Sequence, residues 1–425
     1  MNELQSIVEA YASARERGTR AALATVVGVE GSAYRRPGAR MLLAEDGRTF
    51  GAISGGCLER DVAERASAVF GSSAARLVEY DTRGNEDIVW GVGLGCNGVV
   101  RVLLEGLREG GSGERALRFI GERLLSRARG VIATVIAADS DSSSGVVSSA
   151  AAALVPAVGE RMLFDDKLNV LGETFLNEDL AERARSDALE ILAGGLSRSR
   201  VYEEDGPRVE IFYDVIRPPR PLVVFGAEQD ALPLVRQARA VGWRVTVVDT
   251  RGRRASAERF AEADEVLLCH AEDAAARVPL SEETAVVLMT HNYLDDLELL
   301  RALLPSPACY LGVLGPKQRT SKLLAELGAG AHGVGGSRLA RLHGPAGMDI
   351  GAETPEEIAL SIIAEIKAVC AARVGGFLRD RDAPIHGEAE AEYVPVEANS
   401  ASSRAEAGPH VPPAEGVQLA ACQAS

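Results

Sequence analysis

The sequence predicts an α/β protein in which an α+β domain with an internal duplication precedes a doubly wound parallel sheet. Three observations predict it. The first half repeats four blocks in the same order, residues 216–221 contain three prolines, and strand patterns then alternate with helical ones. Because 425 residues exceed one compact core, we expect domains at 1–217 and 218–374. Residues 375–425, rich in Ala, Glu, Pro and Ser, are predicted to be a mostly disordered tail.

The duplication spans about residues 20–107 and 129–216. In each copy, apolar spacing changes from period two to helical and back, so each reads strand, strand, helix, strand. The matching segments are 22–27 and 131–136, 40–43 and 161–164, 61–66 and 179–184, and 99–107 and 209–216. Four blocks in the same order make chance similarity a poor explanation.

Two cysteines of the first copy lie among glycines, in Gly55-Gly56-Cys57 and in Gly95-Cys96. A thiol flanked by glycines can be approached closely by a bulky ligand, and neighbouring N–H groups can point at an anion or a thiolate. The alternative, a small buried apolar residue, fits this setting poorly. The second copy lacks both cysteines, so only one half is expected to present sulfur.

The other cysteines carry less information. Cys269, Cys309 and Cys370 lie in apolar runs and are expected in the core, and Cys422 lies in the predicted tail. Six cysteines at irregular spacing do not predict a disulfide framework, so we expect a reducing, cytoplasmic compartment.

The second domain opens like a Rossmann fold. The apolar strand 222–225 runs into Gly226, a helix follows from about Ala231, and the next strand ends at Asp249. Glu228 stands where the second glycine of the phosphate-binding turn belongs, and its carboxylate would repel pyrophosphate. Bound NAD(P) therefore does not follow from the fold. Asp249 could hold a ribose hydroxyl or simply be an acid at a strand end.

Polar residues follow two later strands, at the sheet edge where such folds bind ligands. His291, Asn292 and Tyr293 close the fourth strand, and His291 is a candidate proton donor or ligand contact. Gly315, Lys317 and Arg319 follow the fifth strand in a pattern that suits an anionic group such as phosphate. Backbone-bonded or solvated side chains remain the alternative at both places.

Several long motifs together resemble the XdhC/CoxI family of xanthine dehydrogenase accessory proteins, over about residues 5–372. These motifs are Gly31–Met41, Ser54–Glu59, Gly91–Gly98, Thr290–Tyr293, Tyr310–Arg319, and Met348–Gly351 followed by Thr354–Ala359. Two residues depart from the family pattern. Glu228 replaces a usual glycine of the Rossmann turn, and Asn97 stands where many members have glycine.

The resemblance implies a cytoplasmic accessory chaperone that binds molybdenum cofactor, as molybdopterin or a nucleotide form. It also implies support for sulfuration and insertion into a molybdenum hydroxylase such as xanthine dehydrogenase or carbon monoxide dehydrogenase. The implied partners are a cysteine desulfurase and the large subunit of the molybdenum hydroxylase. A homodimer is compatible with such docking.

The residues fit such a cargo, a large anion with a dithiolene and a phosphate. Cys57 and Cys96 would supply thiolates to molybdenum or carry a persulfide. Gly55, Gly56, Glu59 and Gly95 would form their loops. Arg35, Arg36 and Arg40 would supply charge to the phosphate or form a solvated basic face.

Composition excludes some functions. A net charge of −15 and a pI near 5.1 argue against a general nucleic-acid binder. No signal peptide and no apolar run of membrane-spanning length are recognisable. Three functions stay open: a cofactor chaperone without turnover, an NAD(P)-dependent oxidoreductase with His291 and Tyr293 as acid–base groups, and a sulfurtransferase with a persulfide on Cys57.

Overall fold

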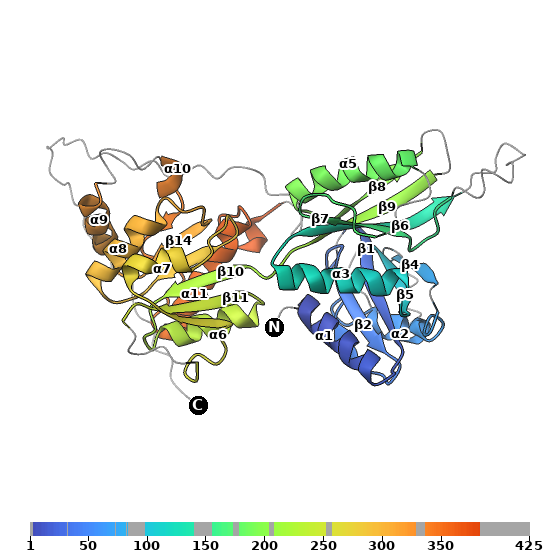
Figure 1. Cartoon of the computed structure of the whole chain (residues 1–425), viewed down its shortest axis with the longest axis horizontal. Coiled ribbons are helices and arrows are strands. Elements are labelled where there is room, and N and C mark those ends of the chain that lie inside the picture. Colours follow the sequence, from blue (N-terminus) through green and yellow to red (C-terminus); the bar gives the residue numbers. More distant parts are fainter. Residues whose placement is uncertain are drawn as a thin grey trace, which may run out of the picture. The chain divides into compact units, whose positions relative to one another are not determined.

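The computed structural model describes residues 3–31, 33–72, 74–81, 83, 98–139, 155–172, 178–203, 208–251, 257–328 and 336–382. Two antiparallel sheets are built from residues before 217, and a parallel sheet is built from residues after it (Figure 1). The predicted α/β fold class is therefore confirmed. Of the predicted tail, residues 375–382 are described and contain one short 3₁₀ turn, Leu378–Asp380.

The first repeat forms a five-stranded sheet in the order β3-β2-β1-β5-β4, with antiparallel neighbours. Its strands are β1 (Ala21–Gly31), β2 (Arg40–Ala44), β3 (Thr49–Gly51), β4 (Ala75–Asp81) and β5 (Gly98–Leu107). Its helices are α1 (Glu3–Glu16), α2 (Glu59–Ala66) and α3 (Ser112–Ser126), the last of which leads to the second repeat. The core strands β1 and β2 are almost continuously apolar because helices and the second sheet cover them.

The second repeat forms a four-stranded sheet in the order β7-β6-β9-β8, which matches β2-β1-β5-β4 of the first repeat. Its elements are β6 (Gly130–Asp139), β7 (Arg161–Asp165), α5 (Glu178–Gly194), β8 (Arg198–Tyr202) and β9 (Arg208–Ile216). The likeness extends to an irregularity, because the central pair shifts register after Val26 in the first sheet and after Val135 in the second. The outer strands β4 and β8, which pair with β5 and β9, were not predicted from the sequence.

The third sheet has the order β12-β11-β10-β13-β14-β15, and all its neighbours are parallel. Counted along the chain this is the 3-2-1-4-5-6 order of dinucleotide-binding folds, with its switch point between β10 and β13. The strands are β10 (Pro221–Phe225), β11 (Arg244–Asp249), β12 (Glu265–Leu268), β13 (Ala285–Leu288), β14 (Tyr310–Val313) and β15 (Leu342–His343). The helices are α6 (Ala231–Ala240), α7 (Ala271–Arg277), α8 (Tyr293–Leu303), α9 (Lys317–Glu326), α10 (Gly336–Leu339) and α11 (Pro355–Cys370).

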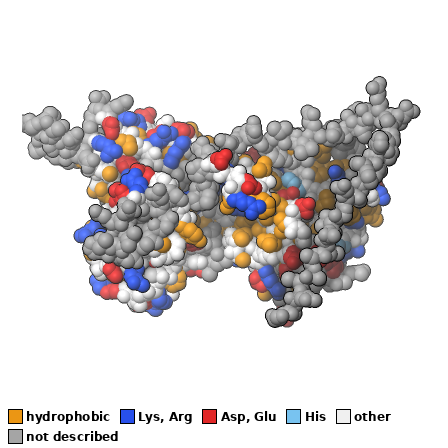
Figure 2. All heavy atoms as spheres, turned by 180° about the vertical axis from the view of Figure 1, so that it is seen from behind, with side chains coloured by type: hydrophobic (Ala, Val, Ile, Leu, Met, Phe, Trp, Pro, Cys, Tyr) orange, Lys and Arg blue, Asp and Glu red, His pale blue; other side chains and the backbone are white. Residues whose placement is uncertain are grey.

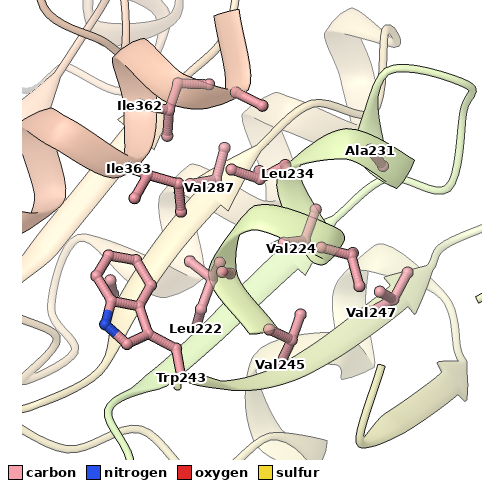
Figure 3. Packing of buried hydrophobic residues seen from close by; sticks show 14 of the residues in the cluster. Leu222, Val224, Ala231, Leu234, Trp243, Val245, Val247, Val287, Ile362 and Ile363 are labelled. Carbon is pink, nitrogen blue, oxygen red and sulfur yellow. The ribbon is translucent and has the colours of Figure 1, made fainter. Parts of the chain in front are cut away.

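Helices cover both faces of this sheet. Helices α6 and α11 pack on one face, where Ile362 and Leu234 meet Val224 and Val287, with Trp243 at the margin (Figure 3). Helices α7, α8 and α9 supply the core of the other face. The sequence predicted the start of α11 correctly, since Thr354 forms a capping box with a glutamate of the first turn. Two apolar faces explain why the strands read as unbroken apolar runs.

Candidate functional sites: a cysteine loop and the carboxyl edge of the parallel sheet

The Cys57 loop connects β3 to α2 and is organised by Ser54. The Ser54 hydroxyl oxygen accepts hydrogen bonds from the N–H groups of Gly56 at 3.2 Å, Cys57 at 3.0 Å and Leu58 at 3.1 Å. These are donors just ahead of α2 that the helix itself cannot pair. The backbone is thus folded around Ser54, and the thiol of Cys57 is left exposed.

Glu59 fixes the other side of this loop. Its carboxylate accepts hydrogen bonds from the Ser54 hydroxyl, from the Ser54 N–H at 2.8 Å and from the Ile53 N–H at 3.3 Å. Burial raises the pKa of Glu59, but these hydrogen bonds outweigh burial and leave the pKa below its usual value. Glu59 is therefore an ionised residue that holds the loop through hydrogen bonds.

The two glycines of the loop have different surroundings, and only Gly56 has a backbone conformation that requires glycine. Gly56 has a φ of +110°, which strains any residue with a side chain. Gly55 lies against the ring of Tyr34, since a Cβ at this position would stand 3.5 Å from Tyr34 Cγ. Tyr34 is 67% exposed, so an open aromatic face stands beside the cysteine loop.

The three arginines expected to bind phosphate have different surroundings. Arg35 pairs with Glu3 at 2.6 Å and is partly buried. Arg36 is exposed and has no ion-pair partner among the described residues. Arg40 is buried and paired with the equally buried Asp214, so its charge is already matched inside the domain. Arg36 is the arginine whose charge faces solvent without such a match.

Gly95 and Cys96 lie outside the described residues, as do Asn97 and most of the motif around them. Strand β5 begins at Gly98, which pairs with Gly31 at the end of β1. The chain therefore returns to the β-sheet two residues after Cys96. Among the described residues, no three His, Cys, Asp or Glu side chains are grouped as they would be around a metal ion.

His291 marks the second site, at the switch point of the parallel sheet. It follows β13 with a φ of +54°, a conformation that is uncommon for a residue with a side chain. Its Nε2 lies 2.8 Å from Asp230 Oδ2, at the position before α6. The other oxygen, Asp230 Oδ1, is buried without a hydrogen-bond partner in the described part of the chain. This contact joins the turn after β10 to the turn after β13.

The turn after β10 differs from a phosphate-binding turn. Gly226 keeps the required backbone, with a φ of +128° and no room for a Cβ beside the Met289 carbonyl. The Asp230 carboxylate, however, lies at the N-terminus of α6, where pyrophosphate binds in this fold. Together with Glu228 it places two acids in this turn. The guanidinium of Arg259 donates to the Ala227 carbonyl at 2.9 Å.

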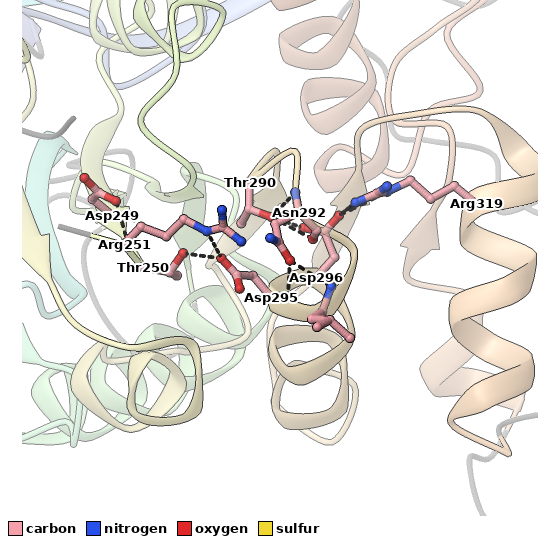
Figure 4. A network of polar contacts seen from close by, with 9 residues as sticks. Asp249, Thr250, Arg251, Thr290, Asn292, Asp295, Asp296 and Arg319 are labelled. Atoms are coloured by element: carbon pink, nitrogen blue, oxygen red, sulfur yellow. Dashed lines mark hydrogen bonds and ion pairs between the residues drawn. The ribbon is translucent and has the colours of Figure 1, made fainter. Parts of the chain in front are cut away.

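A polar network ties together the strand ends at this edge (Figure 4). Asp296 accepts from Thr290 at 2.6 Å and from Arg319 at 2.6 Å. Asp295 accepts from Thr250 and Arg251, both at 2.9 Å. Two acids in the first turn of α8 thus hold the ends of β11 and β13 and the start of α9 in place.

Most of the remaining predicted residues of this edge are held by contacts within the domain, whereas Lys317 is exposed. Asn292 caps α8 by accepting from the N–H groups at positions 294 and 295, while buried Asp249 accepts the Arg251 N–H at 2.9 Å. Tyr293 donates to Glu326 at 2.7 Å and lies under Arg319, which Asp296 already neutralises. At the start of α9, Gly315 has a φ of +123° and Lys317 is exposed. Lys317 has no ion pair within the described ranges.

The roles of three residues at these sites were not predicted from the sequence. Ser54 and Asp230 each stand just ahead of a predicted helix, the position where short polar side chains cap backbone donors, and that signal was available. Asp296 gave a weaker signal, because its partner Arg319 lies 23 residues away. Chain distance hid that pair.

The described part of the surface carries charges of both signs (Figure 2). On the face drawn in Figure 2, basic and acidic side chains are interspersed over the described surface, without a continuous basic stripe. Such a stripe is what nucleic-acid binding uses. None of the helices in the described part of the chain has both the length and the apolar character needed to cross a membrane.

Comparison with known proteins agrees with both halves of the fold. Residues 222–366 match the profile of the XdhC Rossmann domain, and residues 14–81 match that of the XdhC and CoxI family. A protein of Bacillus subtilis (strain 168), named as a probable xanthine dehydrogenase subunit, is 31% identical over 347 residues. The alignment covers 81% of this chain and 92% of that protein.

Two further relatives cover most of the chain. The molybdenum cofactor insertion chaperone PaoD of Escherichia coli (strain K12) is 25% identical over 369 residues, 86% of this chain and 87% of that protein. A crystal structure described as a xanthine dehydrogenase from Bacillus halodurans has a TM-score of 0.68 and 29% identity, covering 88% of this chain and 97% of that one. The motifs, the fold and these relatives agree, and the chain belongs to the XdhC and CoxI family.

Proposed function

We propose that this chain is an accessory chaperone that binds molybdenum cofactor and delivers it to a molybdenum hydroxylase. The observation that carries the proposal is the exposed Cys57 thiol on a loop whose backbone is fixed independently of it. The names of two relatives, a molybdenum cofactor insertion chaperone and a xanthine dehydrogenase subunit, support the same class of cargo and client.

The cysteine loop has the chemistry that such a cargo needs. A thiolate is a soft ligand suited to molybdenum, and exposure at 57 leaves room for a bulky pterin. The open ring of Tyr34 offers a flat apolar surface, and exposed Arg36 offers a cation to the terminal phosphate. Cys96, two residues before β5, is proposed as the second thiolate.

The proposal places no dinucleotide in the turn after β10. Asp230 and Glu228 would bring two negative charges to the place where pyrophosphate needs N–H donors and a positive helix end. A redox enzyme that uses NAD(P) would have to overcome this repulsion at its cofactor site. The Rossmann edge around His291 is therefore proposed to serve the cargo or the client instead.

We also propose that Cys57 carries sulfur for the cofactor. The Cys57 thiolate attacks the terminal sulfur of a persulfide on a cysteine desulfurase, the sulfur–sulfur bond of the donor breaks, and the donor cysteine leaves as a thiolate. No external oxidant is needed, because the transferred sulfur keeps its oxidation state. Exposure of Cys57 gives another protein's persulfide access to it.

The test compares Cys57→Ser with Cys269→Ser, a matched loss of one thiol from the parallel sheet domain. Molybdopterin affinity should fall at least about tenfold in Cys57→Ser, equivalent to ~1.4 kcal/mol, and stay unchanged in Cys269→Ser. Activation of the apo-hydroxylase should fall in parallel. After incubation with a desulfurase and cysteine, wild type should gain the mass of one sulfur on the peptide that contains Cys57.

Thermal unfolding of both variants checks that the fold persists. The chaperone proposal fails if Cys57→Ser, correctly folded, binds molybdopterin and activates the client as wild type does. The sulfur-carrying step fails separately if the Cys57 peptide gains no sulfur while cofactor binding remains normal.

A further inference from the structure

Two cysteines of the parallel sheet domain lie side by side. They belong to a different part of the sequence from the glycine-rich cysteine loops of the first repeat. Cys309 directly precedes β14 and Cys370 is the last residue of α11, and their Sγ atoms are 3.3 Å apart. Both were predicted to lie in the core; in the structure both pack against the hydrophobic core of the sheet and stay partly exposed. They are 61 residues apart in the chain, so folding of the sheet brings them together.

A cation stands beside this pair. Arg220, in the proline-rich segment that enters β10, has its Nη1 3.5 Å from Cys309 Sγ and donates to the Glu283 carbonyl at 2.9 Å. The Cys309 thiol can donate its proton to the Thr284 carbonyl at 3.3 Å or to the Cys370 sulfur. Guanidinium and thiol donors next to a sulfur favour its thiolate form.

The two thiols differ in acidity. A hydrogen bond from Cys309, followed by the charges of Arg220 and Lys367, lowers the pKa of Cys370 to about 7. The same hydrogen bond and burial raise the pKa of Cys309. A pair with one thiolate and one neighbouring thiol is the arrangement in which a mixed disulfide on the first is resolved by the second.

We propose that Cys309 and Cys370 form a reversible thiol–disulfide site that low-molecular-weight disulfides of the glutathione type oxidise. The proposal is independent of the cofactor-binding role of Cys57. The sulfur atoms must approach by about 1.2 Å to reach a disulfide bond length of ~2.05 Å, from the 3.3 Å that now separates them. Side-chain rotation can supply a movement of this size.

The reaction balances with one oxidised glutathione. The Cys370 thiolate attacks one sulfur of the glutathione disulfide, that bond breaks, and one glutathione thiolate leaves and takes up a proton. Cys309 then loses its proton and attacks the Cys370 sulfur, which expels the second glutathione. Counted from the protein dithiol, two electrons and two protons have been lost, and the glutathione disulfide has become two glutathione thiols.

The new bond would enclose β14, α9, α10, β15 and α11 in one covalent loop. This part includes Lys317 and Arg319 of the carboxyl edge, although the cysteines lie near the opposite, amino end of β14. A crosslink of this length restricts the unfolded chain, so oxidation should raise the thermal midpoint of the parallel sheet domain by several degrees. The disulfide would also use the Cys309 sulfur that Arg220 contacts in the reduced protein.

The experiment uses the full chain in the Cys57→Ser background, which removes the thiol that is exposed among the described cysteines. The protein is equilibrated with mixtures of oxidised and reduced glutathione, quenched with acid, alkylated and digested. We expect a peptide pair joined through Cys309 and Cys370, two hydrogens lighter than the separate peptides, and its reversal by excess reduced glutathione. The thermal midpoint should rise with the crosslinked fraction.

Variants assign the two roles. Cys309→Ser should stop at a stable mixed disulfide of glutathione on Cys370, and Cys370→Ser should take up glutathione more than about tenfold more slowly. Cys269→Ser should crosslink as its parent does. The proposal is overturned if the parent protein yields only separately alkylated or glutathionylated cysteines, or crosslinks only between molecules. Because the parent alone gives this answer, a variant that misfolds does not remove the test.

Discussion

Arg161 of the second repeat donates two hydrogen bonds to Glu105 of the first repeat, at 2.8 and 3.0 Å, with both side chains at most 6% exposed. Arg40 of the first repeat makes the reciprocal ion pair with Asp214 of the second. The two arginines occupy equivalent places, as do the two acids, because β1 and β6 pair with their neighbours in the same register. Each repeat thus supplies an arginine that neutralises a buried acid of the other repeat.

Removing one member of such a pair should destabilise the first domain strongly. Arg161→Met leaves Glu105 buried without its partner, so we expect the free energy of unfolding to fall by about 3–5 kcal/mol. Urea unfolding followed by far-ultraviolet circular dichroism measures it. Arg161→Met combined with Glu105→Leu should recover much of the loss, because no unpaired charge remains.

The exposed pair of Arg15 and Glu109 provides the control. Its side chains are 55% and 78% exposed, so Arg15→Met should change stability by no more than about 1 kcal/mol. Equal costs for Arg15→Met and Arg161→Met would contradict the argument that burial decides the energy.

The duplication could be predicted from the sequence, whereas these crossing pairs could not. Alternating apolar residues report which segments are strands, and their repetition reports which strands correspond. An ion pair between residues 56 or 174 positions apart leaves no periodic trace. Arg40 therefore looked like an available cation, and only the fold brings Asp214 to it.

The candidate sites show the same division. Glycines around Cys57 predicted an exposed thiol because few other settings use so many residues without side chains. The contact between His291 and Asp230 depends on two loops meeting at the switch point, although both residues stood at predicted strand or helix ends. The sequence predicted which residues lie at the edge of the sheet, and the structure showed which of them contact one another.

Gly226→Ala should destabilise the parallel sheet domain. A Cβ there would lie 2.2 Å from the Met289 carbonyl oxygen, at a φ of +128° that already disfavours alanine. We expect a loss of about 3 kcal/mol and faster hydrogen exchange in β10 and β13. Gly172→Ala is the control, with a φ of +113° and no atom of the described residues within 4 Å of the added Cβ, and should cost about 1 kcal/mol. Similar costs at both positions would show that the close approach is unimportant.

Glu59→Gln should remove part of the pH dependence of the cysteine loop. Because hydrogen bonds lower the pKa of Glu59 below its usual 4.5, its contribution is present above pH 4.5 and is lost as pH falls through the lowered value. At pH 7 we expect Glu59→Gln to cost about 1 kcal/mol, a modest figure because the carboxylate is only partly buried. Urea unfolding at pH 7 and near pH 3 should show this cost shrinking in acid. Glu64→Gln, at an exposed position of the same helix, is the control and should cost no more than about 0.5 kcal/mol at pH 7.

Alkylation of Cys370 should report its acidity directly. A hydrogen bond from Cys309, together with the charges of Arg220 and Lys367, lowers the pKa of Cys370 to about 7, so its rate with iodoacetamide should rise through neutral pH. Burial raises the pKa of Cys269, which should therefore reach its full rate only at higher pH in the same digest. Arg220→Gln should move the Cys370 profile to higher pH and leave that of Cys269 in place. Coincident profiles for the two cysteines, or a Cys370 profile unmoved by Arg220→Gln, would remove the electrostatic basis for Cys370 as the attacking thiolate.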